Sequence, residues 1–452
     1  MTTETDTKLN TSTASLMQLN DDVLALIVRY LNVYQQFQLA QLHIRLSSIV
    51  QMLWRTRIRN VVLEDEMFRR SATSSKEFLA FILALGPFMQ GLSCHGMDVR
   101  RLRHLSSHTL GGITSFEWMA ETQRRGRVRF VDEDVRLLRR VFPSLRKLKL
   151  RGCQITGKYL CDLELLKELS LDDCQFLESQ YFPDIFRQLQ LRKFDIMEDC
   201  DEVNCCDLVD LQLCPTLEHI KIADYHLCME SDITQQLLQL PRLHKLSIYS
   251  RNFVFDVLSR IARPNNLPPG GELRGIIGGR QQQIEGFRFS GLLHDYGRFF
   301  RELSNLRQLQ RLELHGLLEE GQDQLQCLED QALLHLSTKL PALTELHLCG
   351  YQLESPAGIL EFIIHCRQLK IVNFTRSKCL GDALVWRSLG ILTKQKWRHE
   401  PIRLWIGESD INPEIIHSSR YLDNERLLRI ETKRLSHHED YMNGVLKFCF
   451  VR

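Results

Sequence analysis

A six-residue pattern, L-x-x-L-x-L, recurs along most of the chain and constrains its fold more than any other feature. Its fullest copies are LRKLKLRGCQI from Leu145 and LKELSLDDCQF from Leu166, and between Leu166 and Leu243 the copies begin 25 to 26 residues apart. Further copies begin at Leu191, Leu217, Leu243, Ile284, Leu309, Leu343 and Leu369, and weaker ones at Ile58, Met89, Ile113 and Pro401. Apolar residues alternate in the second half of each copy, which predicts a short strand with one buried face.

One such unit cannot cover its own apolar face, so neighbouring units are expected to stack. Between the strands, segments such as DITQQLLQLPRL from Asp232 predict helical returns against the same interior. The two fullest copies fit the leucine-rich-repeat consensus in its cysteine form, in which Cys153 and Cys174 occupy the turn after the strand. A dinucleotide-binding parallel sheet is disfavoured, because no G-x-G-x-x-G follows a strand and the period is too short.

A different periodicity precedes the repeats. In LNDDVLALIVRYL, from Leu19 to Leu31, apolar residues recur at the spacing of one helical face. Asn20 or Asp21 can cap this helix, because a short side-chain oxygen accepts orphan backbone N–H groups. Further helical spacing runs from Leu39 to Trp54. A unit this short buries too little of its own surface to be stable alone, so part of its apolar face is expected to belong to a partner.

Residues 16–56 resemble an F-box, the three-helix motif that docks on a Skp-type adaptor. The family pattern opens Leu-Pro-x-Glu-Val/Ile-Leu, continues to Ile-Phe-x-Tyr-Leu and often ends in Leu-Trp. The chain departs from it with Asn20 where Pro is usual and Val28 where Phe is usual. The residues aligned with the pattern, these two departures included, are Leu19, Asn20, Asp22, Val23, Leu24, Ile27, Val28, Tyr30, Leu31, Leu39, Leu42, Arg45, Leu46, Leu53 and Trp54.

The resemblance to the F-box/leucine-rich-repeat family covers about residues 16 to 400. It implies a substrate-recognition subunit of an SCF-type (Skp–cullin–F-box) ubiquitin ligase, with a Skp-type adaptor and a cullin–RING core as partners and no catalysis by this chain. The side chains expected to divide between self-packing and adaptor contact are Leu19, Val23, Leu24, Ile27, Val28, Leu31, Leu39 and Leu42.

The third and fifth positions of the strand pattern face away from the core and predict a client-binding face. Glu168, Asp195, Glu313 and Glu345 also occupy such positions, but cations outnumber them. This positive stripe suits an acidic or phosphorylated peptide. Ordinary solubilising charge is the alternative interpretation, and it stays open. The cations of the stripe are Lys147, Lys149, Lys193, Lys221, Lys245, Arg288 and Arg311.

The totals narrow the classes of function. A net charge of +2 on 452 residues gives no reason to expect a nucleic-acid or membrane partner. The fourteen cysteines contain no Cys-x-x-Cys pair, and the polar N-terminus lacks the apolar segment of a signal peptide, so a cytoplasmic or nuclear protein with free thiols is expected. No catalytic motif occurs, and the cysteines between Cys200 and Cys214 match no zinc spacing. We therefore expect no cofactor and no metal.

The expected fold is α/β: a three-helix F-box followed by a leucine-rich-repeat solenoid with short parallel strands on its concave face. We expect a disordered tail at 1–15, an F-box-like domain at 16–56, and a linker with degenerate leading repeats at 57–140. The solenoid spans 141–400, with a Pro- and Gly-rich loop insertion near 263–283, and a degenerate repeat and C-terminal cap follow at 401–452. Two rival functions stay open, a solenoid scaffold unrelated to ubiquitin and, less favoured, a nucleic-acid-associated protein.

Overall fold

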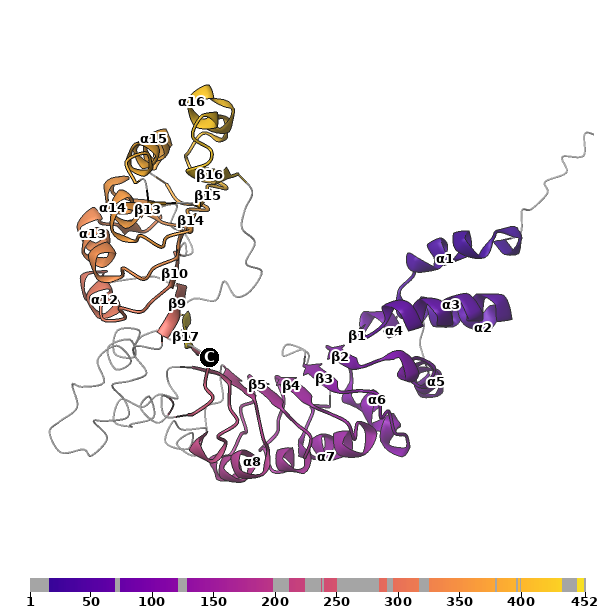
Figure 1. Ribbon diagram of the computed structural model, residues 1–452. Helices are drawn as coiled ribbons and strands as arrows, with labels where there is room; N and C mark the ends of the chain where they lie inside the picture. The colour runs from indigo at the N-terminus through magenta and orange to yellow at the C-terminus, as the bar shows by residue number, and fades with distance from the viewer. Residues whose placement is uncertain are drawn as a thin grey trace, which may run out of the picture. The chain divides into compact units, whose positions relative to one another are not determined.

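The structure is a computed structural model, and Figure 1 traces its helices and strands. The tail at 1–15 and the insertion near 263–283, both named above, lie outside the described residues. The residues described are 16–69, 74–120, 128–197, 211–223, 237, 240–249, 284–290, 296–316, 325–378, 380–395, 397–398, 400–432 and 445–450.

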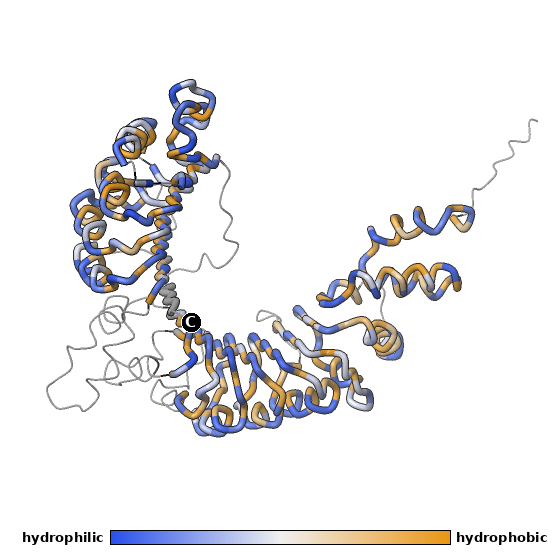
Figure 2. The backbone as a smooth tube through the Cα atoms, viewed as in Figure 1, coloured by the Kyte–Doolittle hydropathy of each residue, from blue (hydrophilic) through white to orange (hydrophobic). Residues whose placement is uncertain are grey.

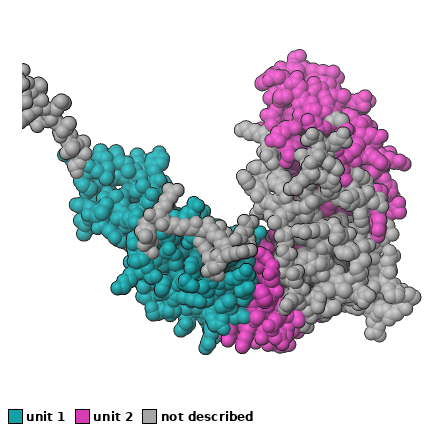
Figure 3. Space-filling view, turned by 180° about the vertical axis from the view of Figure 1, so that it is seen from behind, with its two compact units in different colours: residues 1–154 teal, residues 155–452 magenta. Residues whose placement is uncertain are grey.

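The chain divides into two compact units, residues 1–154 and 155–452 (Figure 3). The first unit begins, after the short turn Leu16–Gln18, with helices α1 (Asp21–Arg29), α2 (Val33–Leu42) and α3 (Ile44–Arg57). A side chain caps each start: Asn20 accepts from Val23 N at 2.8 Å, and Asn32 exchanges bonds with Gln35 in a capping box. These caps explain why α1 and α2 begin where they do.

Four parallel strands follow in the first unit, in the order β1-β2-β3-β4. They are β1 (Asn60–Glu64), β2 (Gly91–His95), β3 (Ser115–Met119) and β4 (Lys147–Arg151). The weak sequence copies at Ile58, Met89 and Ile113 therefore form strands. The helical segments of this part are α4 (Glu66–Arg69), α5 (Ser75–Leu85), α6 (Val99–Arg103) and α7 (Asp132–Val141).

The second unit repeats the strand-and-return plan. Its main sheet has the order β5-β6-β7-β8-β17-β9-β10-β12-β14-β15-β16, and β11 (Cys327–Leu328) pairs with β13 (Gln352–Leu353) beside it. The strands are β5 (Glu168–Asp172), β6 (Lys193–Met197), β7 (His219–Ala223), β8 (Lys245–Tyr249), β9 (Ile284–Ser290), β10 (Arg311–His315), β12 (Glu345–Cys349), β14 (Ile371–Asn373), β15 (Ile402–Trp405), β16 (Leu428–Glu431) and β17 (Val445–Phe450). The helices are α8 (Phe182–Gln188), α12 (Tyr296–Leu303), α13 (Asp330–Lys339), α14 (Ala357–His365), α15 (Gly381–Leu392) and α16 (Ser419–Leu422).

The leucines of the repeat pattern form the core of each unit. In the copy that begins at Leu166, that residue, Leu169 and Leu171 are fully buried, and Figure 2 shows the recurring apolar positions along the strands. Cys153 and Cys174 are buried after β4 and β5, and each Sγ donates to a strand carbonyl, that of Arg151 and of Asp172 respectively. The leucine-rich-repeat fold expected from the pattern is therefore confirmed, with its cysteines in the turns as predicted.

The last strand departs from expectation. The alternation in Val445–Phe450 was expected to cap the final repeat, but β17 lies between β8 and β9 and runs antiparallel to both. Alternation predicts a strand but carries no information about its neighbours, because pairing with an element far away in sequence depends on tertiary structure.

A candidate docking surface on the N-terminal helices

The residues expected to contact an adaptor divide into two groups. Leu24 and Val28, on α1, are each 1% exposed and pack inside the unit together with Ala25, so these two are on the self-packing side of the expected division. The reason is the turn of the helix, which places positions four apart on the same face. Leu19, Val23, Ile27 and Leu42 are exposed, whereas Leu31 and Leu39 are half-buried.

The exposed residues of α1 form a stripe that the sequence reasoning saw only in part. Val23, Leu26, Ile27 and Tyr30 are 38%, 51%, 39% and 91% exposed and follow the i, i+3, i+4, i+7 spacing of one helix face. We call these four residues the outer stripe of α1. Leu26 was missed, and Tyr30 was assigned only to the F-box pattern and not to adaptor contact. Both were detectable from their helical spacing with Val23 and Ile27. An apolar face that the described residues leave exposed is a feature of interaction sites.

Polar contacts of Arg45 attach the start of α1 to α3. The guanidinium of Arg45 donates from Nε to Asp21 Oδ1, from Nη1 to Met17 O and from Nη2 to Leu19 O, each at 2.7 Å. These bonds bring the first turn of α3 to the start of α1, and Ile44, next to Arg45, is 81% exposed. The start of α3 therefore carries a further exposed apolar side chain.

The end of α1 is attached to α2 and α3 in the same way. Gln36 Nε2 donates to Val28 O at 3.1 Å and to Leu31 O at 2.9 Å, and its Oε1 accepts from Trp54 Nε1 at 2.8 Å. Trp54 and Leu24 are buried in the unit. The start of α1 is thus held by α3 and its end by α2, which itself bonds to α3, so a partner would meet a pre-formed surface.

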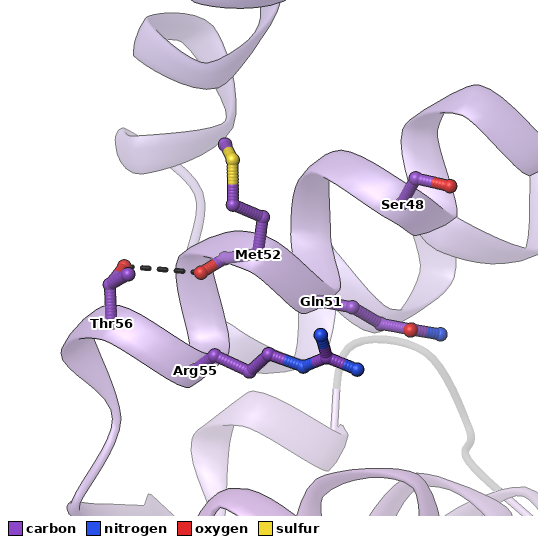
Figure 4. A pocket seen from close by; sticks show the side chains of 5 residues that line it. All are labelled: Ser48, Gln51, Met52, Arg55 and Thr56. Carbon is purple, nitrogen blue, oxygen red and sulfur yellow. Dashed lines mark hydrogen bonds between the residues drawn. The ribbon is translucent and has the colours of Figure 1, made fainter.

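The exposed side of α3 carries a shallow depression of about 330 Å³ (Figure 4). Its lining comes from one helix, with Thr56 Oγ1 donating to Met52 O at 3.1 Å and Met52 half exposed. A methionine adapts to the shape of a bound surface because its side chain is unbranched and flexible. The residues that line the depression are Ser48, Gln51, Met52, Arg55 and Thr56.

Several cations of the predicted positive stripe form ion pairs within the chain. Lys147 and Lys149 belong to the first unit and the other five cations to the second, and most of the seven meet acids of the chain. Lys149 Nζ lies 2.8 Å from Glu117 Oε1 on the neighbouring strand, and Lys193 Nζ lies 2.8 Å from Asp195 Oδ2. Lys147 is exposed, and Lys221 and Lys245 are half-buried. The expected excess of unsatisfied cations is therefore replaced, at these strands, by ion pairs.

The same pairing is densest around Glu313 in the second unit. Arg311 Nε lies 2.5 Å from Glu313 Oε1 and 3.2 Å from Glu345 Oε2, and Arg288 Nε lies 3.6 Å from Glu313 Oε2. Burial alone would raise the pKa of Glu313. The hydrogen bond from His315 and the charges of its other cationic neighbours outweigh burial, and hold the pKa of that carboxyl well below its usual range.

A chain of polar bonds extends from this cluster through β12 and β14. Thr375 Oγ1 donates to Asn373 Oδ1 at 2.7 Å, and Asn373 Nδ2 donates to His347 Nδ1 at 3.3 Å. Nε2 of His347 then donates to Glu345 Oε2 at 3.4 Å. His347, Asn373 and Thr375 are all buried. Sequence reasoning placed the two acids and His347 on this face but missed the other two, because only the register of β12 on β14 brings them together.

Two thiols of the second unit have raised pKa values. Burial raises the pKa of the Cys349 and Cys366 thiols to about 12, so both are protonated and inert at neutral pH. Within the described ranges, no three His, Cys, Asp or Glu side chains are grouped to hold a metal ion. Nor does that part of the chain contain a helix of the length and apolar character needed to cross a bilayer.

No family model matches the chain, and no curated protein matches it. Among solved structures, an internalin from Listeria monocytogenes is 15% identical and covers 85% of this chain and 89% of its own, with a TM-score of 0.34. A chain of the yeast Rad7 and Elc1 complex is 14% identical, over 57% of this chain and 69% of that chain, with a TM-score of 0.33.

Proposed function

We propose that the chain is the client-receptor subunit of an SCF-type ubiquitin ligase, with α1–α3 docking on a Skp-type adaptor linked to a cullin–RING core. Two observations support the proposal: residues 16–56 resemble the F-box pattern, and α1, α2 and α3 lie within this range. The observation that carries it is the outer stripe of α1, a rigidly held apolar face that the described residues of the chain leave exposed.

In this role the chain performs no bond chemistry and acts in the cytoplasm or nucleus. The solenoid holds a client while the adaptor fixes the helical end, which raises the effective concentration of client lysines near the conjugating enzyme. An acidic or phosphorylated client segment would compete with Glu117 for Lys149 and with Asp195 for Lys193, the lysines that these acids contact in the structure.

The test is co-purification of the full chain with a recombinant Skp-type adaptor. In the variant Ile27→Ala/Tyr30→Ala both substitutions fall on exposed side chains, so the fold is retained. We expect adaptor binding to weaken at least about tenfold, since truncating interface anchors, tyrosines in particular, typically removes the largest share of binding energy.

The matched control is Leu422→Ala, an exposed leucine of similar apolar size on α16 of the second unit. It should leave adaptor binding unchanged. If neither the double variant nor the control alters binding, or if the intact chain does not bind the adaptor at all, the ligase assignment is wrong. The remaining interpretation is then a leucine-rich-repeat scaffold that is not involved in ubiquitination.

A further inference from the structure

The main sheet of the second unit contains one break in its order. Consecutive described strands pair parallel from β5 to β8 and again from β9 to β16. Between the two runs lies β17, which pairs antiparallel with β8 on one side and with β9 on the other. The position that completes this sheet is therefore filled from the far end of the chain, out of sequence order.

The backbone makes this position a strand-shaped slot. Lys447 pairs with Ser247 on β8 and with Arg288 on β9, so β17 bonds along both of its edges. Adjacent strands lie about 4.8 Å apart, so β8 and β9 are separated by the width of one strand. Without an occupant both would present unpaired N–H and C=O groups, the edge that extended peptides bind by strand addition.

The walls of the slot select the side chains of an occupant. Toward the core, Leu246 on β8 and Phe287 and Phe289 on β9 are buried. The register places Leu446 and Phe448 of β17 in the rows of these three residues. An occupant thus needs apolar residues at two positions separated by one.

The intervening position is poorly matched by the chain's own strand. Lys447 stands directly opposite Arg288, whose Nε lies 3.6 Å from Glu313. Like charges directly opposite one another across an antiparallel pair are destabilising, and opposite charges are stabilising. An occupant with an acidic residue at this position would pair better than β17 does.

We propose that the position between β8 and β9 is a strand-binding site, occupied in this structure by residues 445–450 and open to an extended peptide with an apolar–acidic–apolar core. This inference rests on the proposed function only in taking that peptide to be part of a client. The C-terminal strand then acts as an internal competitor that such a client displaces.

The experiment uses the full chain with a protease site placed at residues 434–440 and cut after folding, so that the C-terminal piece is held only by its contacts. The probes are fluorescent peptides of residues 443–452 with Cys449→Ser, carrying Lys447, Lys447→Glu, or Lys447→Glu together with Phe448→Pro. We expect the glutamate peptide to replace the C-terminal piece and to bind about threefold to fivefold more tightly than the lysine peptide. The proline peptide should bind at least about tenfold more weakly, because proline removes a ladder N–H.

Arg288→Ala in the cut chain should abolish the preference for glutamate over lysine without abolishing binding. Equal binding of all three peptides, or no displacement of the C-terminal piece at excess peptide, would overturn the proposal. If the cut chain unfolds, hydrogen exchange on the uncut chain decides: Lys447→Glu should slow amide exchange in β8 and β9 relative to Lys447→Arg, and equal rates would overturn it. Adaptor co-purification is a separate readout, so either proposal can fail alone.

Discussion

The outer stripe of α1 and the outward face of the strands around Glu313 are both regular rows of side chains. They differ in whether those side chains already have partners within the chain. Val23 and Tyr30 are apolar and exposed, with their contact area unused. Glu313 is buried and contacts Arg311, Arg288 and His315. Side chains that already form ion pairs within the chain gain little free energy from a partner. Exposed apolar side chains gain free energy when a partner removes them from water. Under the proposed function, the helices would therefore supply the stable docking surface and the strands the more selective, exchangeable contacts.

The largest effect should distinguish the two faces of α1. Leu24→Ala removes a buried side chain, and we expect it to lower the free energy of unfolding of the first unit by about 2–5 kcal/mol. Ile27→Ala, three residues away on the exposed face, should change that stability by less than about 1 kcal/mol. Chemical denaturation of each variant measures both values. Similar losses would mean that α1 does not have one inner and one outer face.

A smaller effect should follow from breaking the cluster around Glu313. In Glu313→Gln the carboxylate is lost and Arg311, Arg288 and His315 keep a neutral neighbour, so we expect about 1–3 kcal/mol of destabilisation. The matched control is Glu414→Gln, an exposed acid in the same unit, which should have almost no effect. If both variants unfold at the same denaturant concentration, the strand face is not self-satisfied as described.

The same cluster should make stability depend on pH. The pKa of Glu313 is held below its unfolded value, so its contribution is complete above about pH 5 and is lost as pH falls toward the lower folded value. Burial also lowers the pKa of His315, so below about pH 6.5 the unfolded state takes up a proton that the folded state does not, and the free energy of unfolding falls. The thermal midpoint should therefore decrease from pH 7 to pH 3, and less steeply in Glu313→Gln. Parallel profiles for the two proteins would contradict this account.

The smallest effect belongs to the exposed ion pairs of the strands. Lys149→Ala should change stability by no more than about 1 kcal/mol, because Lys149 is exposed, Glu117 also accepts from Ser93 Oγ, and the pair is partly screened by solvent. Charge reversal at Lys193 and Lys221 should weaken client capture, and the loss should be larger at low salt than at high salt. A pull-down with an acidic peptide at two ionic strengths measures this difference, and equal capture under all conditions would remove the strand face from client binding.

The strands and their turns were predictable from the sequence, because each depends on a short local pattern. The alternation in LRKLKL located β4, and even the weak copy at Ile58 located β1. The cysteine in the turn could be placed because a small thiol bonding to a carbonyl is part of that local pattern. In these repeats, local and tertiary preferences agree.

The contents of the two surfaces were less predictable, because they depend on partners distant in sequence. The charge at Lys149 counts as free until the register of β3 on β4 sets it beside Glu117. Leu24 and Ile27 are equally apolar, so only the packing of α1 on α3 decides which one stays outside. The position of β17 was unpredictable for the same reason, since the sequence of residues 445–450 does not specify that it pairs with β8 and β9.

The buried thiols of Cys153 and Cys174 can report local opening in each of the two units. Each Sγ bonds to the carbonyl two residues before it, one in residues 1–154 and the other in residues 155–452. A thiol-specific reagent can reach either sulfur only when its turn opens. The labelling rate of each cysteine therefore reports how often its repeat opens locally in the unmodified protein. Exposed Cys327 sets the rate of the unhindered reaction.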